Sequence, residues 1–413
     1  MSASRFSALG SALSNRNYAI YISCNSVSLI GFWMQRLAVS WLTWEISHSE
    51  FWVGAVAFAE IAPLIVVGPL FGVWADRFDR KGMAVVIQVL MMAQAFVLFY
   101  LAVTGRLTIA LLFSLALIEG VVQAAYQPIR LALVPNLVPK KDLVAASAFT
   151  AVMFNVARFL GPAIAGVIMS LYGAAFAVLV NGITYGLIVI AWFFIRLPDM
   201  APATGRQQSF FTDIKAGFRY VLDIPALFYM FVLLTFIGLF ARPLTFMLSA
   251  FVGAVYERGP ETLALFTSAM GIGAVLAGLK LSMDGQTRGL VRAILLSTLG
   301  SIIATIWFAG TDRLWLATGL IFFLGYAITI ASVASQTLVQ NSIDDRMRGR
   351  VLSLWVAGTR GAPAIGVLII GWFASRFGLM WPNVVAALLC LMVLVLMNRR
   401  RRVMRGFFES DAQ

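Results

Sequence analysis

Charged side chains stand inside several long apolar stretches of this chain, where a charge is costly to bury. They are Arg36, Glu60, Glu119, Arg158, Arg242 and Arg360. A charge in such a stretch is expected to pair with another charge, carry a proton or bind a substrate. The carboxylates point to reversible protonation, and the guanidinium groups point to ion pairing or the binding of an anion.

Two pairs of opposite charge follow from the depth of these residues along their stretches. Arg36 and Glu60 fall at similar depths in neighbouring stretches, and so do Glu119 and Arg158. Apolar surroundings disfavour a charged carboxylate and a nearby arginine favours it, so a small rearrangement can switch its protonation. Glu119 is the first candidate for a proton carrier and Glu60 is the second. The alternative for each pair is a purely structural ion bridge.

Arg242 and Arg360 have no acidic residue inside the apolar stretches of their half of the chain. Their excess positive charge makes them candidates for the wall of a substrate cavity, where they would attract an anionic group. Each could instead extend to the membrane surface or bind a backbone carbonyl. Arg130, near the end of its stretch, is expected at the interface.

The most highly charged short segment is GVWADRFDRKG, residues 72–82, between two apolar stretches. Its glycines permit a tight turn. Asp76 follows a predicted helix, where a negative charge meets the negative end of the helix dipole and needs a compensating partner. The alternative is a plain cluster of charges that sets orientation in the membrane, although acidic residues contribute little to orientation.

Composition and length of the apolar stretches define the class of fold. Of the 413 residues, 61% are hydrophobic and 12% are charged, and the mean hydropathy is +0.90. Helices of about 20 apolar residues span a bilayer. The sequence therefore predicts an all-α membrane protein with twelve transmembrane helices. Their predicted ranges are 18–44, 51–75, 83–103, 107–130, 144–171, 174–196, 225–250, 262–283, 290–310, 313–338, 351–374 and 379–398.

Lysine and arginine are divided unevenly between the predicted loops. With both termini on one side, the loops of the other side hold only Arg106, Arg258, Arg313 and Arg376. Positive charge collects on the cytoplasmic side, so both termini are predicted to be cytoplasmic in a multi-pass protein of the cell (inner) membrane. This one-sided distribution explains the net charge of +13, which orients the protein in the lipid bilayer. No nucleic-acid partner is predicted.

An internal repeat divides the chain into two halves. Residues 155–173 resemble residues 355–378, and both contain Pro-Ala-Ile followed by glycine. Two related six-helix halves are typical of secondary transporters. We expect an N-terminal six-helix half, a cytoplasmic linker with an amphipathic segment at 210–220, a C-terminal six-helix half and a basic cytoplasmic tail. Their predicted ranges are 1–197, 198–224, 225–398 and 399–413.

The charged loop resembles the signature loop of the major facilitator superfamily. The matching residues are Gly72, Asp76, Arg77, Arg80 and Lys81. Asp79 stands where the superfamily usually has glycine. The segments WMQRLAVSWL (33–42) and ARFLGPAIAG (157–166) resemble the superfamily's bacterial efflux branch, which includes the enterobactin exporter.

This resemblance implies a major facilitator fold of two pseudo-symmetric six-helix halves, and roles for several residues. The matching loop residues would form a conformational latch, in which Asp76 reaches the helix that starts near Arg350 and stabilises the outward-open state. Gly161, Pro162 and Gly166 partly match the fifth-helix motif of drug/proton antiporters and would serve as a hinge or packing site. The arginine of the fourth-helix motif is replaced by Ala116, so proton coupling by that arginine is not supported.

The predicted function is secondary active transport by alternating access, with efflux of a small amphipathic or anionic molecule, such as a siderophore or drug, in exchange for protons. Uptake or flipping of a metabolite or lipid on the same fold, and a non-transporting membrane sensor, are the alternatives. The chain has no phosphate-binding glycine loop, a single histidine and two cysteines, so no enzyme, cofactor or metal site is predicted. The expected partners are a small-molecule substrate and protons, and the expected state is a monomer.

Overall fold

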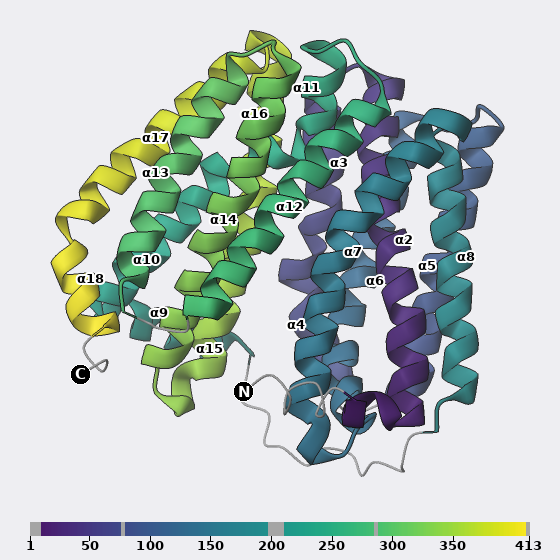
Figure 1. Cartoon of the computed structure of the whole chain (residues 1–413), viewed down its shortest axis with the longest axis horizontal. Helices are drawn as coiled ribbons and strands as arrows, with labels where there is room; N and C mark the ends of the chain where they lie inside the picture. Colours follow the sequence, from purple (N-terminus) through teal and green to yellow (C-terminus); the bar gives the residue numbers. More distant parts are fainter. Residues whose placement is uncertain (1–9, 76–78, 197–209, 285–287, 410–413) are drawn as a thin grey trace. The chain divides into compact units, whose positions relative to one another are not determined.

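The computed structural model describes residues 10–75, 79–196, 210–284 and 288–409, whose regular elements are all helices (Figure 1). Eleven helical segments in these ranges are long and apolar enough to cross a membrane. The helix α2 (Arg16–Ser47) covers the first predicted span and, with 32 residues, is long enough to be the twelfth. The prediction of an all-α membrane protein is confirmed.

Packing divides the chain into two compact units. The first consists of Met1–Ser47, Ala62–Gly205 and Gly259–Ala264, and the second of His48–Ile61, Arg206–Arg258 and Leu265–Gln413. The predicted second span is shared between them, because α3 (Glu50–Ile61) belongs to the second unit and α4 (Pro63–Ala75) to the first. The predicted division of the chain at 197 and 225 into two halves joined by a linker stays a prediction.

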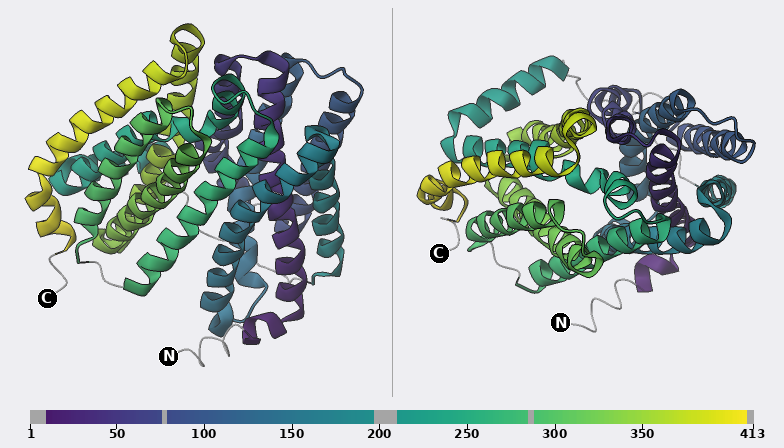
Figure 2. Two further views of the ribbon diagram at one scale, coloured as in Figure 1. Left: turned by 45° about the horizontal axis from the view of Figure 1, so that its top comes forward. Right: turned by 90° about the horizontal axis from the view of Figure 1, so that it is seen from above.

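In the first unit, α2 packs against α7 and α8, and α5 packs against α6 and α8. The pairing of α5 with α8 can be followed in Figure 1 and from two further sides in Figure 2. The helices of this unit besides α2 and α4 are α5 (Arg80–Val103), α6 (Ile109–Leu133), η1 (Val134–Asn136), η2 (Lys140–Asp142), α7 (Leu143–Tyr172) and α8 (Ala174–Phe194).

In the second unit, α13 packs against α14 and α17, and α3 packs against α16. The elements of this unit besides α3 are α9 (Phe210–Asp223), α10 (Pro225–Phe236), η3 (Ile237–Ala241), η4 (Pro243–Phe246), α11 (Leu248–Ala254), most of α12 (Pro260–Asp284), α13 (Leu290–Ala309), α14 (Leu314–Ser342), α15 (Asp345–Val356), η5 (Ala357–Gly361), α16 (Ala362–Phe377), α17 (Met380–Arg399) and α18 (Arg401–Phe408). The large core of this unit lies among α10, α13, α14 and α17.

Prolines mark the breaks in three predicted spans, because a proline lacks the N–H that continues a helix. The second span breaks at Ala62, directly before Pro63. The seventh widens into the π-helical turn η3 before Pro243, and the eleventh into the π-helical turn η5 before Pro363. The seventh and eleventh spans thus share a π-helical turn shortly before a proline.

Helices also form in the predicted linker and tail. The amphipathic segment is the helix α9, which packs on α15. In the tail, α18 buries Met404 and Phe408 against its own unit, and Oε1 of Glu409 accepts a hydrogen bond from the backbone N–H of Val291 at the start of α13 (3.0 Å). The side chain of Glu409 therefore satisfies one of the unpaired donors at a helix start.

Candidate functional site

A buried network of neutral side chains contacts Glu119 in the first unit. From Nε2, Gln35 on α2 donates to Oε2 of Glu119 on α6 (3.0 Å) and to Oε1 of Gln94 on α5 (3.1 Å). Asn181 on α8 donates to Oε1 of Gln35 (2.8 Å), and Thr184 donates to Oδ1 of Asn181 (3.1 Å). All five residues are buried, Glu119 with 4% of its surface exposed. The carboxamide of Gln35 therefore links α2 to α5, α6 and α8.

The contact between Gln35 and Glu119 can form in both protonation states of Glu119. A carboxamide is neutral, and its N–H can donate to a carboxylate or to the carbonyl oxygen of a protonated carboxyl group. A hydrogen bond to a charged acceptor is roughly twice as strong as one to a neutral acceptor. A proton on Glu119 would consequently weaken the bond that joins α2 to α6.

The predicted arginine partners lie beside an indole ring. The Cζ atoms of Arg36 and Arg158 lie 5.5 and 5.7 Å from the ring centroid of Trp33. Two guanidinium groups, one from α2 and one from α7, thus share one aromatic residue in cation–π contact. Glu60 belongs to α3 in the second unit. The pairings of Glu119 with Arg158 and of Arg36 with Glu60 stay predictions.

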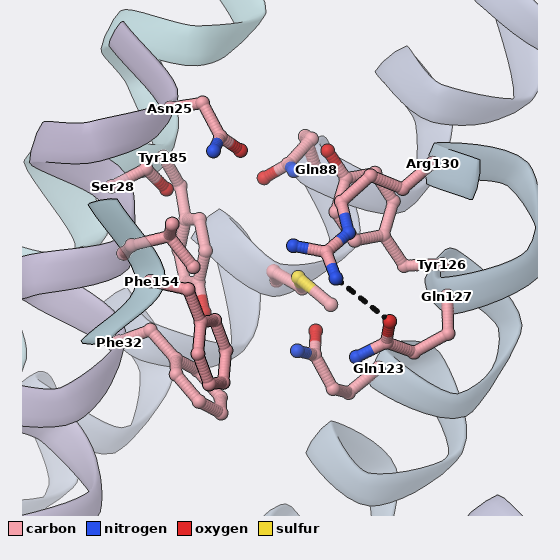
Figure 3. Close-up of a pocket in the computed structure, with 12 residues that line it drawn as sticks. Asn25, Ser28, Phe32, Gln88, Gln123, Tyr126, Gln127, Arg130, Phe154 and Tyr185 are labelled. Carbon is pink, nitrogen blue, oxygen red and sulfur yellow. Dashed lines mark hydrogen bonds between the residues drawn. The ribbon is translucent and has the colours of Figure 1, made fainter. Parts of the chain in front are cut away.

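A polar pocket lies in the same unit (Figure 3). It is a small, partly open cavity of about 30 Å³. Its lining comes from the unit's α2, α5, α6, α7 and α8, and consists of Asn25, Ser28, Leu29, Phe32, Gln88, Met91, Gln123, Tyr126, Gln127, Arg130, Phe154 and Tyr185. Arg130 and Gln127 lie on one side of this pocket, and the rings of Phe32 and Phe154 lie on another.

Arg130 lines the pocket, a contact that the sequence analysis does not predict. It lies in the last turn of α6, which continues to Leu133, and its Nη2 donates to Oε1 of Gln127 (3.1 Å). Its expected position at the membrane interface stays a prediction. The signal in the sequence is a polar stripe with helical spacing, which runs through Glu119, Gln123, Gln127 and Arg130.

The pocket and the Glu119 network share the helices α2 and α8. On α2, Ser28 and Phe32 of the pocket precede Gln35 of the network by one to two turns. On α8, Asn181 of the network precedes Tyr185 of the pocket by four residues, which is one turn. The pocket and the network therefore lie within about two helical turns of each other.

The predicted latch lies only partly in the described ranges. Asp76 and Arg77 fall outside them, Gly72 lies in α4, and Arg80 is the first residue of α5. Nζ of Lys81 donates to the backbone carbonyl of Ile195, which follows α8 (2.7 Å). Lys81 therefore has a structural contact in addition to its predicted role.

Asp79, the departure from the superfamily pattern, caps α5. Its Oδ1 accepts from the backbone N–H of Lys81 (3.1 Å) and its Oδ2 from that of Gly82 (2.8 Å). An aspartate at this position satisfies two donors at the helix start, which a glycine cannot do with a side chain.

The predicted cavity and hinge residues occupy defined places within their units. Arg242 donates from Nη2 to Oγ of Ser332 on α14 (2.6 Å), and Arg360 is exposed on η5.

Gly161 lets α7 approach α2, since a Cβ there would lie 2.5 Å from Cβ of Trp33, and Gly166 faces Ala264. Pro162 is buried in α7. The structure shows close packing at Gly161 and Gly166, and the hinge role stays a prediction.

A family model described as "transmembrane secretion effector", of the major facilitator type, matches residues 7–410. The chain belongs to this family of membrane transporters. Among curated relatives, the staphyloferrin A transporter of Staphylococcus aureus is 23% identical and the match covers 87% of this chain and 90% of the relative. The enterobactin exporter EntS of Escherichia coli is 26% identical, with 95% and 94% covered. The resemblance to the major facilitator efflux branch is confirmed.

Solved structures share the fold. A bacterial homologue of the human lysosomal transporter Spinster has a TM-score of 0.74 at 13% identity, with 95% of this chain and 98% of that chain covered. A bacterial homologue of the iron transporter ferroportin has a TM-score of 0.70 at 15% identity, with 92% and 98% covered. These likenesses show the fold, and the family match makes the chain a membrane transporter that takes a small-molecule substrate.

Proposed function

We propose that this transporter exports a small organic anion of the siderophore class in exchange for protons. The observation that carries this proposal is the buried carboxyl group of Glu119, which a neutral carboxamide of Gln35 contacts inside the first unit. The substrate class comes from the relatives, which are named as a transporter of staphyloferrin A and an exporter of enterobactin.

The proposed coupling uses the hydrogen bonds of Gln35. When Glu119 binds a proton, the bond from Gln35 loses its charged acceptor and weakens. Gln35 also bonds Gln94 and Asn181, so a shift of its side chain is felt by α5 and α8. A proton would thereby bias the packing of four helices, which is the kind of change that alternating access needs.

The proposed setting is the inner membrane of the cell, with both termini in the cytoplasm and one chain as the working unit. The uneven distribution of lysine and arginine supports this orientation. We retain the latch in the cytoplasmic loop 72–82 as part of the proposal, with Asp76 and Arg77 as its central residues. Arg360, Glu60 and the Glu119–Arg158 pair remain secondary candidates for substrate attraction and proton coupling.

The deciding experiment uses proteoliposomes that contain a pH-sensitive dye and hold an imposed proton gradient. Catecholate and carboxylate siderophores, a lipophilic cation and a neutral sugar are added in turn to either side. We expect the siderophores alone to move protons, in the direction opposite to their own. Glu119→Gln should abolish this movement while substrate exchange without a gradient continues.

Glu45→Gln is the matched control, because Glu45 is exposed near the end of α2 and loses the same charge. It should behave as the unmodified protein. Proton movement with the cation alone would replace the substrate class, and full proton-driven transport by Glu119→Gln would remove Glu119 from the coupling. Proton and substrate movement in the same direction would make the transporter a symporter and overturn export by exchange.

A further inference from the structure

The pocket of the first unit holds a positive charge that faces neutral groups. Arg130 has five N–H donors, and the acceptor it has in the described part of the chain is the carboxamide of Gln127. The described residues that line the pocket include no aspartate or glutamate. A guanidinium group in such surroundings is suited to a carboxylate, which it can bind through two parallel hydrogen bonds.

Buried polar atoms around the pocket also lack well-formed hydrogen bonds. Within the described ranges, Nδ2 of Asn25, Oε1 of Gln88 and the hydroxyl groups of Tyr126 and Tyr185 have no hydrogen bond of good geometry, although the Tyr126 hydroxyl lies close to Gln88 and that of Tyr185 close to Asn181. These four residues are 3 to 6% exposed, and all four line the pocket. Buried donors and acceptors in native proteins are nearly always satisfied, by protein, water or ligand. The pocket therefore presents both donors and acceptors to whatever occupies it.

The remaining wall is apolar and includes aromatic rings. Phe32 and Phe154 lie together on the side of the pocket away from Arg130 and Gln127 (Figure 3). Leu29 and Met91 complete the apolar lining. An occupant with an apolar ring, an anionic group and hydroxyl groups would match these parts of the lining.

We propose that this pocket is a subsite for a hydroxylated aromatic carboxylate, with the carboxylate on Arg130 and the ring beside Phe32 and Phe154. The hydroxyl groups of the ligand would meet Gln88, Asn25 and the tyrosine hydroxyls. This inference rests on the proposed function, since it assigns one substrate group of that transporter to these residues. A purely structural role for Arg130, at the last turn of α6 where a cation suits the helix dipole, is the competing explanation.

The test measures binding to the purified full-length protein in detergent by titration calorimetry, with salicylate and salicylamide as probes. Both have the same ring and hydroxyl group, but only salicylate is charged. We expect salicylate to bind more tightly than salicylamide. Arg130→Gln should weaken salicylate binding by about tenfold or more, since it removes hydrogen bonds to a charged group, and should leave salicylamide binding nearly unchanged.

Arg106→Gln is the matched control, because Arg106 is an exposed arginine in the loop before α6. It should bind both probes like the unmodified protein. Gln88→Leu gives a second test that keeps the charge, and it should weaken both probes. Equal binding of salicylate by Arg130→Gln and the unmodified protein would overturn the proposal. If the unmodified protein is folded, as its unfolding temperature shows, and binds no salicylate, the proposal is overturned as well.

The two proposals fail separately. If salicylate binds as expected but no siderophore moves protons, the proposed transport reaction fails and the subsite stands. If siderophores drive proton exchange equally well in Arg130→Gln vesicles, the transport reaction stands and the subsite fails.

Discussion

Arg242 donates a hydrogen bond from Nη1 to the backbone carbonyl of Thr359 (2.8 Å). Pro363 follows Thr359 by four residues and has no N–H, so this carbonyl cannot receive the usual α-helical hydrogen bond. The guanidinium group of Arg242 supplies the missing donor from another helix. Binding of a backbone carbonyl is the alternative to a substrate role for Arg242, and the structure contains this contact beside the one with Ser332.

Removal of Arg242 should destabilise the second unit through this carbonyl. Arg242→Leu leaves the Thr359 carbonyl and the Ser332 hydroxyl without their donor, which we expect to cost about 1–3 kcal/mol and to lower the unfolding temperature. In a Pro363→Ala background the restored N–H can bond Thr359, so Arg242→Leu should cost less there. Thermal unfolding of the four proteins in detergent measures the difference. Equal costs in both backgrounds would mean that Arg242 acts on something other than this carbonyl.

Asp79 should matter for the start of α5 more than for transport. Asp79→Ala removes the side-chain cap and should cost about 0.5–2 kcal/mol, whereas Asp79→Asn should retain most of it. Hydrogen exchange at the backbone amides of Lys81 and Gly82 should become faster in the alanine variant. Unchanged exchange at these two amides would contradict the capping role.

The glycines of two helices should respond differently to the same substitution. Gly161→Ala places a Cβ 2.5 Å from Cβ of Trp33 and 2.9 Å from the carbonyl of Ile30, so we expect a loss of about 1–3 kcal/mol from overpacking. Gly278→Ala on α12 meets nothing within 4 Å and serves as the control. Its unfolding temperature should stay level or rise. A stable Gly161→Ala protein would show that α7 can move away from α2.

The latch predicted in loop 72–82 is tested by Asp76→Asn, which removes a charge and keeps the shape. We expect a shift away from the outward-open state and slower transport. Distance measurements between labelled helix ends, with and without substrate, report the distribution of states. The control is Asp312→Asn, in a loop between α13 and α14. An unchanged distribution together with unchanged transport would rule out the latch.

The positions of the helices could be predicted from the sequence because each span must supply a long apolar run. Breaks inside spans were harder to place. Pro63 and Pro363 stand in similar apolar runs, yet one ends a helix and the other follows a π-helical turn. The difference depends on contacts with other helices, such as that of Arg242 with Thr359, and a single sequence does not contain them.

The candidate site was predictable only in its charged members. Glu119 is conspicuous in an apolar run, whereas Gln35 and Asn181 are neutral and give little sign of burial in the sequence. Their partnership depends on the rotation of α2 and α8 about their axes, which packing decides. The place of Arg130 in the pocket was not predicted for a similar reason, because the end of an apolar run does not reveal which way the last turn of a helix faces.

The bond between Lys81 and the carbonyl of Ile195 bears on how relatives of this protein diverge. It joins the signature loop to the end of a helix 114 positions later. A change in the length of α8 would move that carbonyl, and the lysine would lose its acceptor. Among relatives, variation at position 81 should therefore follow insertions and deletions at the end of α8, independently of the compound that each protein transports.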